Sequence, residues 1–249
     1  MVWLSRLAAV GFVLALPLLL ITSNVRFLAG EQRLYERGFR EYNSDERTGL
    51  DLQQLDRAAS EVIDYFENDA TTLRITVVDG GDEVSLYNTR ETEHMKDVKS
   101  LIRTVFRVNE ISLAYVLTYI AAVFIWAGGA PLRRLAMLSL AGIGVGVLIV
   151  GFVLGAAALY GFDATWTRFH TLVFNNDFWR LNPATDRLIQ MFPEPFWQEE
   201  TYLLAAMTIA EVFVIVIAAI LCLTIGARRR SGPAAGSGIQ PARARRVRA

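Results

Sequence analysis

Two histidines, His94 and His170, are the residues whose type best suits proton-transfer chemistry, and the chain contains only these two. Histidine has an unperturbed pKa close to neutrality, so it is the side chain that most often serves as a general acid or base. If both rings reach the same place, they could move protons to and from a substrate. The sequence leaves open the alternative of two unrelated surface or hydrogen-bonded histidines.

Charged residues lie close to His94 in the sequence. Asp97 follows His94 by three positions, so in a helix the two would share a face and the carboxylate could fix the tautomer of the imidazole. Lys96 points elsewhere on such a helix. It could meet a lipid phosphate, or it could belong to an ordinary solvated run of charges.

A second polar set follows His170. His170, Phe174 and Asp177 have the i, i+4, i+7 spacing of one helical face, provided that this segment is helical. Asn175 and Asn176 carry amide donors that could polarise a carbonyl group. They could equally form a turn, and the periodicity does not choose between the two.

These residues belong to polar segments of a chain that is otherwise strongly apolar. Hydrophobic residues make up 53% of the chain while the formal net charge is zero, so charged and apolar residues are separated into blocks, as in a membrane protein. Four apolar runs are long enough to cross a hydrocarbon core of about 30 Å. They cover residues 7–25, about 111–127, about 135–159 and about 202–226.

The distribution of charges predicts the orientation of the four spans, because cytoplasmic loops retain Lys and Arg. Residues 26–110 hold 12 cations and 18 acids, and residues 160–200 hold 3 and 6. The segments expected on the inner side hold ten cations and no acid: Arg6, Arg133, Arg134, Arg228, Arg229, Arg230, Arg243, Arg245, Arg246 and Arg248. We therefore expect both termini in the cytoplasm and both histidines on the outer side. A cleaved signal peptide is the alternative for residues 7–25, but no clean A-x-A site follows that run, which favours a retained helix.

The segments between the spans have their own patterns. Residues 51–67 have the spacing of an amphipathic helix, and alternation on both sides of Asp79-Gly80-Gly81-Asp82 predicts a short hairpin. A helical stretch from about residue 91 leads into the second span. The outer segment after the third span is dense in aromatic residues that settle at the membrane interface.

The expected fold is an all-α membrane protein, a four-transmembrane-helix bundle with a small α+β extracytoplasmic cap. Its expected parts are transmembrane helix 1 (1–25), the cap (26–110), transmembrane helices 2 and 3 with a short cytoplasmic loop (111–159), an extracytoplasmic aromatic loop (160–201), transmembrane helix 4 (202–226) and a disordered basic cytoplasmic tail (227–249).

Two features inside the predicted spans concern packing. The third span contains two GxxxG steps, formed by Gly142, Gly146, Gly151 and Gly155. Such steps permit close approach of a neighbouring helix.

Glu211 lies in the fourth span, where an ionised carboxylate costs at least about 2.5 kcal/mol unless it is paired or protonated. We expect it to face the bundle in a structural hydrogen bond, with Tyr115 or Tyr119 as its partner.

Several familiar catalytic motifs are absent from the sequence. It has no GxSxG elbow, no HExxH, no P-loop and no Rossmann glycine pattern. The single cysteine, Cys222, lies in an apolar run near the predicted inner face, which excludes a disulfide framework and an outward-facing thiol nucleophile. An enzyme built from these residues would work by general base catalysis and positioning, without a covalent intermediate.

Two longer motifs surround the histidines. They read E-H-M-K-D-V-K at residues 93–99 and F-H-T-L-V-F-N-N-D-F-W-R-L-N-P-A-T-D-R-L-I-Q-M-F-P-E-P-F-W at residues 169–197. Together with the four spans, the chain resembles the bacterial lipoprotein intramolecular transacylase (Lit) family over about residues 1–226. The resemblance implies transfer of an acyl chain from the sn-2 position of a diacylglyceryl group to the N-terminal cysteine amine of the same lipoprotein, which yields a lyso-form lipoprotein.

The resemblance also implies which residues carry the reaction. The two catalytic histidines of the family correspond to His94 and His170. Our hypothesis makes His170 the base that deprotonates the amine, and His94, oriented by Asp97, the acid that protonates the departing glyceryl oxygen. The two roles could be exchanged. The other expected site residues are Asn176 and Asp177, which would orient the reacting groups, and Lys96, Trp179 and Trp197, which would bind the substrate.

The expected partners are a diacylglyceryl lipoprotein and membrane lipids, with no nucleic acid, no metal and no cofactor. The chain is expected to act as a monomer in the bacterial cell membrane. Two other functions fit the same residues. A non-enzymatic protein could bind lipids or lipoproteins through the outer aromatic loop, and the histidines with Asp97 or Asp177 could form a zinc site, for which such dispersed ligands give weak support.

Overall fold

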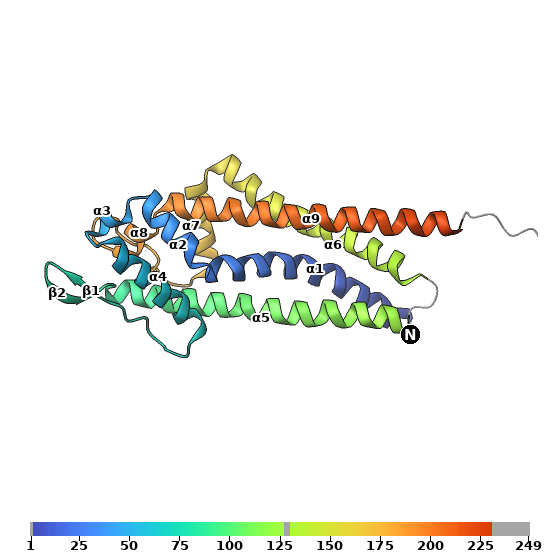
Figure 1. Cartoon of the computed structure of the whole chain (residues 1–249), viewed down its shortest axis with the longest axis horizontal. Coiled ribbons are helices and arrows are strands. Elements are labelled where there is room, and N and C mark those ends of the chain that lie inside the picture. Colours follow the sequence, from blue (N-terminus) through green and yellow to red (C-terminus); the bar gives the residue numbers. More distant parts are fainter. Residues whose placement is uncertain (1, 127–129, 231–249) are drawn as a thin grey trace, which may run out of the picture.

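The computed structural model describes residues 2–126 and 130–230, and four long helices dominate it (Figure 1). They are α1 (Val2–Gly30), α5 (Thr89–Trp126), α6 (Pro131–Tyr160) and α9 (Glu194–Arg230). Each coincides with one predicted apolar run and is long and apolar enough to cross a membrane. The predicted bundle of four membrane helices is therefore confirmed. From residue 231 onward, the predicted basic tail lies outside the described residues.

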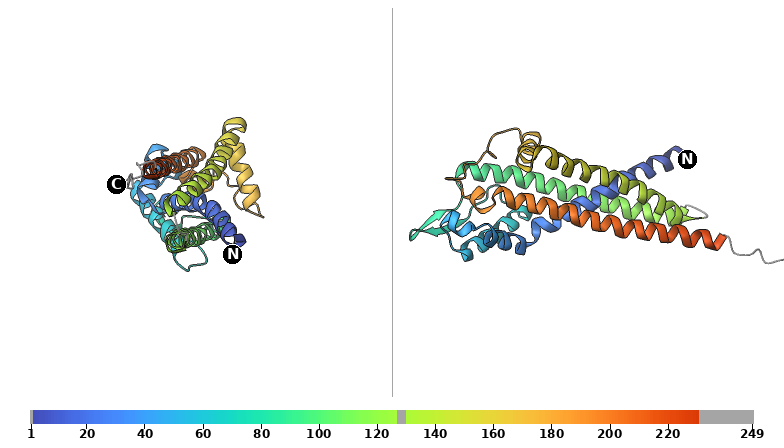
Figure 2. Two further views of the ribbon diagram at one scale, coloured as in Figure 1. Left: turned by 90° about the vertical axis from the view of Figure 1, so that its right-hand side faces the viewer. Right: turned by 90° about the horizontal axis from the view of Figure 1, so that it is seen from above.

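The other three long helices share α1 as a neighbour. It packs against α5, α6 and α9, and α6 also packs against α9 (Figure 2). An apolar seam joins α1 to α5, in which Phe12 and Leu16 meet Val116 and Tyr119. The rings of Phe12 and Tyr119 lie 4.8 Å apart in this seam. The position of α5 in the bundle is thus set by its contact with α1.

The helix that carries His94 is much longer than a membrane crossing requires. With 38 residues, α5 extends for roughly 57 Å at 1.5 Å per residue, about twice the thickness of the hydrocarbon core. Its apolar part begins near Ile111, and the polar part before it runs into the cap (Figure 1). This confirms the prediction that a helical stretch leads directly into the second span.

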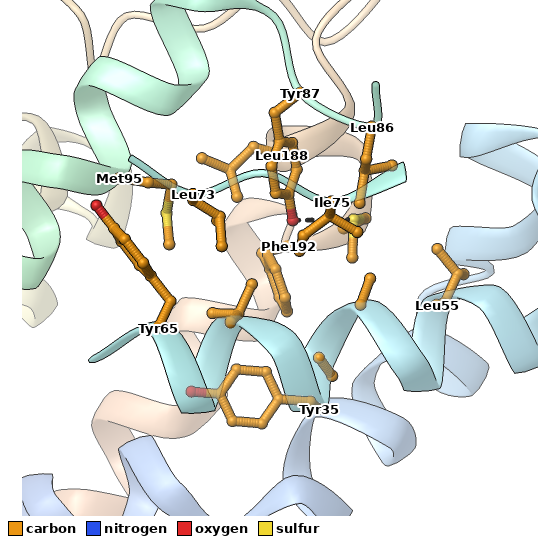
Figure 3. Packing of buried hydrophobic residues seen from close by; sticks show 14 of the residues in the cluster. Tyr35, Leu55, Tyr65, Leu73, Ile75, Leu86, Tyr87, Met95, Leu188 and Phe192 are labelled. Carbon is orange, nitrogen blue, oxygen red and sulfur yellow. Dashed lines mark hydrogen bonds between the residues drawn. The ribbon is translucent and has the colours of Figure 1, made fainter. Parts of the chain in front are cut away.

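The cap is built from short helices and one hairpin around an apolar core of its own (Figures 1 and 3). Its elements are α2 (Gln32–Glu41), α3 (Ser44–Thr48), α4 (Leu52–Glu67), β1 (Thr76–Asp79), β2 (Asp82–Ser85) and α8 (Arg187–Met191). The helix α4 is the predicted amphipathic helix, and its apolar face is buried. Figure 3 shows Leu55 on that face and Ile75 just before the hairpin, with Phe192 from the second outer segment in the same cluster. Both outer segments therefore share one core.

The predicted hairpin is present and short. Strands β1 and β2 pair antiparallel, with Thr76 opposite Ser85 and Asp79 opposite Asp82. The two residues of the turn, Gly80 and Gly81, have φ angles of 61° and 96°, a region of backbone conformation that favours glycine. The composition of this turn explains why the sequence could locate the hairpin.

The second outer segment is more helical than its composition indicates. A helix, α7 (Phe162–Val173), follows α6 after Gly161, whose φ angle of 87° lets the chain change direction there. From its aromatic residues, we expected this segment to be a loop at the membrane interface. The spacing of His170, Phe174 and Asp177 indicated a helix only if the segment was helical. The helix matters because it places His170.

Glu211 is held by an amide and not by a tyrosine. Nδ2 of Asn24 on α1 donates to Oε2 of Glu211 and to Oγ1 of Thr208, each at 3.1 Å. The predicted contact with Tyr115 or Tyr119 is therefore wrong. Tyr119 packs in the seam near Phe12. The Tyr115 hydroxyl donates to the backbone carbonyl of Ala8, which lies sixteen residues before Asn24 on α1 and so at a different depth of the bundle.

One of the two GxxxG steps lies in a tight helix contact. A Cβ atom added at Gly142 would lie 3.0 Å from a backbone carbonyl oxygen of α1, and one added at Gly146 would lie 3.1 Å from Cβ of Pro17. At Gly151 and Gly155, apart from the adjoining residues and the backbone of α6 itself, no atom of the described residues lies within 4 Å of such a Cβ. Only the first step brings α6 close to α1.

We predict that Gly142→Leu lowers the thermal unfolding temperature of the detergent-solubilised protein, because a leucine there would force α6 away from the α1 backbone. A loss of about 1–3 kcal/mol is typical of such overpacking. Gly155→Leu places the same side chain on the same helix in open space and is the matched control. Equal unfolding temperatures for the two variants would contradict the packing described above.

Candidate active site

The structure brings the two histidines together. His94 lies in the second turn of α5 and His170 near the end of α7, and each is 7% exposed. Their ring centroids are 6.0 Å apart, with the ring planes inclined by 39°. Phe174 contacts both rings, at 5.3 Å from His94 and 5.6 Å from His170. One small substrate group could therefore reach both imidazoles.

The tautomer of His170 is set by the backbone of its own helix. Its Nδ1 lies 2.8 Å from the carbonyl oxygen of Trp166. Because a carbonyl oxygen only accepts, Nδ1 carries the hydrogen, and Nε2 of the neutral ring keeps its lone pair. Burial lowers the pKa of His170, partly offset by this hydrogen bond, which favours the protonated ring. The ring is thus a neutral base whose Nε2 can accept a proton.

His94 has a different environment. Its Nδ1 is buried and has no hydrogen-bond partner among the described residues. The predicted orientation of this ring by Asp97 is therefore wrong in its detail. The Asp97 carboxylate accepts instead from the side-chain amide of Asn176, whose Nδ2 lies 2.8 Å from Oδ2. A free Nδ1 leaves either ring nitrogen of His94 able to hold the proton.

The contact between Asp97 and Asn176 joins the two histidine-bearing segments. Asp97 lies one turn after His94 on α5, and Asn176 lies six residues after His170 in the segment that leaves α7. The Asn176 side-chain oxygen also accepts from the backbone amide of Phe178 at 3.1 Å, which holds the segment in a turn. This hydrogen bond therefore links the segment after α7 to α5 one turn from His94.

Asp177 is not brought to the histidines. The spacing of His170, Phe174 and Asp177 required a continuous helix, but α7 ends at Val173 and the chain leaves it in an extended conformation at Phe174. The Asp177 side chain is 77% exposed and pairs with Arg180 at 2.8 Å. The predicted orienting role for Asp177 is not supported by this position.

Tryptophans form much of the wall around His170. The ring of Trp179 lies 5.0 Å from the His170 ring, and that of Trp166 lies 4.7 Å from it. Trp197 stacks on Trp166 at 5.3 Å, and its indole N–H donates to the carbonyl of Phe192. The two tryptophans expected to bind substrate are thus next to the site. Trp166 was missed, although its position four residues before His170 is the signal that could have found it.

A cavity of about 620 Å³ opens in front of the two histidines. Its lining is mainly apolar and comes from α1, α2, α4, α5, α7, α8, α9 and the segment after α7. Trp179 and Trp197 are part of the lining, but Lys96 is not. Lys96 is exposed and pairs with Glu93 at 3.4 Å, which fits the alternative that it belongs to a solvated run of charges. Such a volume is typical of pockets that enclose most of a small ligand.

Four charged side chains line the cavity besides the histidines. They are Asp163, Arg180, Glu194 and Glu200. None of these was singled out from the sequence. Within residues 2–126 and 130–230, no three His, Cys, Asp or Glu side chains gather as a set of metal ligands.

The model of one protein family, the lipoprotein intramolecular transacylase Lit, matches residues 10–197. The chain belongs to this family. The match includes both motifs around the histidines, and it confirms the resemblance that those motifs indicated. No match was found among curated proteins.

Solved structures agree on the fold. The structure of the membrane integral lipoprotein intramolecular transacylase Lit from Bacillus cereus is similar with a TM-score of 0.68 and 17% identity, over 93% of this chain and all (100%) of that one. Two variants of that protein, with a histidine replaced by arginine or by alanine, have TM-scores of 0.67 and 0.65. They are 17% and 19% identical, over 92% of this chain and 95% and 96% of theirs. At such identities the likeness concerns the fold.

The lowered pKa of His170 predicts how the stability of this family member depends on pH. The unfolded chain binds a proton at His170 below a pH of about 6.5, whereas the folded chain does so only at lower pH. Protonation therefore favours the unfolded state as the pH falls through that range. We expect the thermal unfolding temperature to drop between pH 7.5 and pH 5.

His170→Gln should make this drop smaller, because glutamine does not titrate. Thr171→Ala changes the exposed residue next to His170, which has no titratable group, and should leave the drop as in the unaltered protein. An identical pH dependence in His170→Gln would contradict a buried, neutral His170.

Proposed function

We propose that this chain moves the sn-2 acyl chain of a diacylglyceryl-modified lipoprotein to its N-terminal cysteine amine, which gives the lyso form. Family membership supports the reaction class. The observation that carries the proposal further is the pair of buried imidazoles, 6.0 Å apart, that face one mainly apolar cavity. The ester and the amine of one lipid anchor could both reach the part of the cavity between the two imidazoles.

The proposed first step is attack of the amine nitrogen on the ester carbonyl carbon. An α-amine has a pKa of about 7.7–8.0, so part of it is neutral near pH 7 and the rest needs a proton acceptor. Nε2 of His170 has the free lone pair, because Nδ1 donates to the Trp166 carbonyl. His170 therefore acts as the general base.

The proposed second step breaks the bond between the ester carbonyl carbon and the sn-2 oxygen. The departing oxygen takes a proton from one nitrogen of the neutral His94 ring while the other nitrogen of that ring takes up the proton that the attacking nitrogen loses, and the product carries a new amide and a free hydroxyl at sn-2. His170 releases to solvent the proton that it took from the ammonium form of the amine, so both rings end as they began. The substrate supplies the nucleophile, and no serine or thiol is needed.

Positioning supplies much of the rate in this proposal. Holding an amine and an ester in contact can contribute about 7–11 kcal/mol to lowering the barrier. The hydrogen bond between Asn176 and Asp97 fixes the segment after α7 against α5, and Trp179 and Trp197 confine the anchor beside His170.

We predict that His94→Gln and His170→Gln each lower formation of the lyso form by about 10²–10⁴-fold, the usual contribution of a general acid or base. The measurement is mass spectrometry of a lipoprotein N-terminus from a host that lacks the activity. Unfolding temperature and membrane expression serve as controls for folding.

The alternative, a non-enzymatic protein that binds lipids or lipoproteins through the aromatic segment, predicts a different result. No lyso form would appear even with the unaltered chain at good expression. Both histidine variants would then bind a lipoprotein as the unaltered chain does.

We also propose that the cavity faces the outer side of a bacterial cell membrane, with both termini in the cytoplasm. Ten cations without an acid on the expected inner segments support this orientation. In a Cys222→Ser background, Asp69→Cys should react in intact cells with a membrane-impermeant maleimide, because the Asp69 side chain is fully exposed on the cap. Ser231→Cys should react only after permeabilisation. The opposite labelling pattern would refute the orientation.

A further inference from the structure

Glu200 is a carboxylate in the cavity wall to which the proposed reaction gives no role. It lies in the second turn of α9, and its side chain is 13% exposed. Oε1 pairs with Arg37 of α2 at 3.3 Å, but Arg37 makes a shorter pair, 2.8 Å, with the neighbouring Glu199. Glu200 therefore shares its cation with another carboxylate.

The second oxygen of Glu200 has no partner. Oε2 is buried, and no hydrogen-bond donor among the described residues reaches it. Tyr35 lines the same cavity, but its hydroxyl donates to the carbonyl of Ala29 instead. A buried acceptor without a donor costs free energy, and more so when it is charged. A ligand that brings a donor would remove that cost.

The place of Glu200 relative to the histidines follows from a chain of contacts. Trp197 lies three residues before Glu200, on the same side of α9. The Trp197 ring stacks on Trp166, and the Trp166 carbonyl holds Nδ1 of His170. Glu200 and His170 therefore line one cavity, with two indole rings between their helices. Indole faces attract cations, as carboxylates do.

We propose that Glu200 is a positioning residue that binds the protonated N-terminal amine of the lipoprotein substrate within the cavity. The terminal torsion of a glutamate is broad, so a small rotation turns Oε2 toward the bound cation. The ammonium then gives one proton to Nε2 of His170, and its nitrogen lone pair becomes free to attack the ester. The identity of this ligand rests on the proposed function.

The other two carboxylates of the lining fit the same role less well. Glu194 and Asp163 also line the cavity, but both are exposed, so water can satisfy them without a ligand. Arg180 is the cation of the lining, and it is paired with Asp177. Glu200 is the carboxylate of this wall that combines burial with an unpartnered oxygen.

Binding of an unreactive ligand tests the inference without turnover. The probe is a cysteinyl lipopeptide whose two acyl esters are replaced by ethers, compared with the same compound lacking the amino group. With the full chain in detergent, we expect the compound with the amine to bind more tightly by about ten-fold, the size of one charge-assisted hydrogen bond. Glu200→Gln should remove this preference.

Glu199→Gln is the matched control. It also removes a carboxylate from Arg37, and it replaces the charged acceptor of the Tyr42 hydroxyl by a neutral amide, but Glu199 does not line the cavity. This variant should keep the preference for the amine. With the reactive ester substrate, Glu200→Gln should raise KM by more than it lowers kcat, since the histidines remain in place.

Three outcomes would overturn the inference. They are equal binding of the two compounds by the unaltered chain, an unchanged preference in Glu200→Gln, and an equal loss in Glu199→Gln, which would assign Glu200 a purely structural role through Arg37. None of these depends on whether the lyso form is made. A failed transacylation test would contradict the proposed function. The preference of the cavity for the compound with the amine could still be measured by binding.

Discussion

Two imidazoles buried side by side in an apolar cavity are the constraint on which the rest of the structure depends. Two like charges 6.0 Å apart in such surroundings would repel each other, and each would lose its hydration. The rings are therefore kept neutral, which gives one of them a lone pair to accept a proton. The same burial requires α7 to lie against α5, although 75 residues separate the two histidines.

The fold meets this requirement by giving both outer segments a common core. Residues of the first outer segment build α4 and the hairpin, and Phe192 from the second segment packs among them. The link between Asn176 and Asp97 then joins the segment after α7 directly to α5. The membrane helices fix where the segments start and end, and the shared core fixes how they meet. The two histidines lie where these two constraints coincide.

The sequence predicted the parts of this structure that depend on composition and local period. The four spans, the amphipathic helix α4 and the Gly-Gly hairpin each follow from a pattern within a few dozen residues. The closeness of His94 and His170 was suggested by topology and by the two motifs, because residues at the same membrane face can meet.

Pairings between side chains could not be predicted in the same way. Asp97 was expected to hold His94 because it lies one turn away, but it bonds to Asn176, 79 residues further along the chain. Asp177 was expected on the face of His170, but α7 ends first. Glu211 was expected to meet a tyrosine, but Asn24 lies at its depth. Which side chains pair depends on where the helices end and how they are tilted. The local periodicity of the sequence carries no information about either.

The uninterrupted course of α5 has a mechanical consequence. His94 lies 17 residues before Ile111, where the apolar part of the helix begins, so the polar part is a rigid arm of about 25 Å at 1.5 Å per residue. A change of a few degrees in the tilt of the span would swing its far end by roughly 1–2 Å, and hydrophobic mismatch with a thicker or thinner bilayer is relieved by such changes of tilt. Such a swing would carry His94 and the Asp97 link to the segment after α7 along with it.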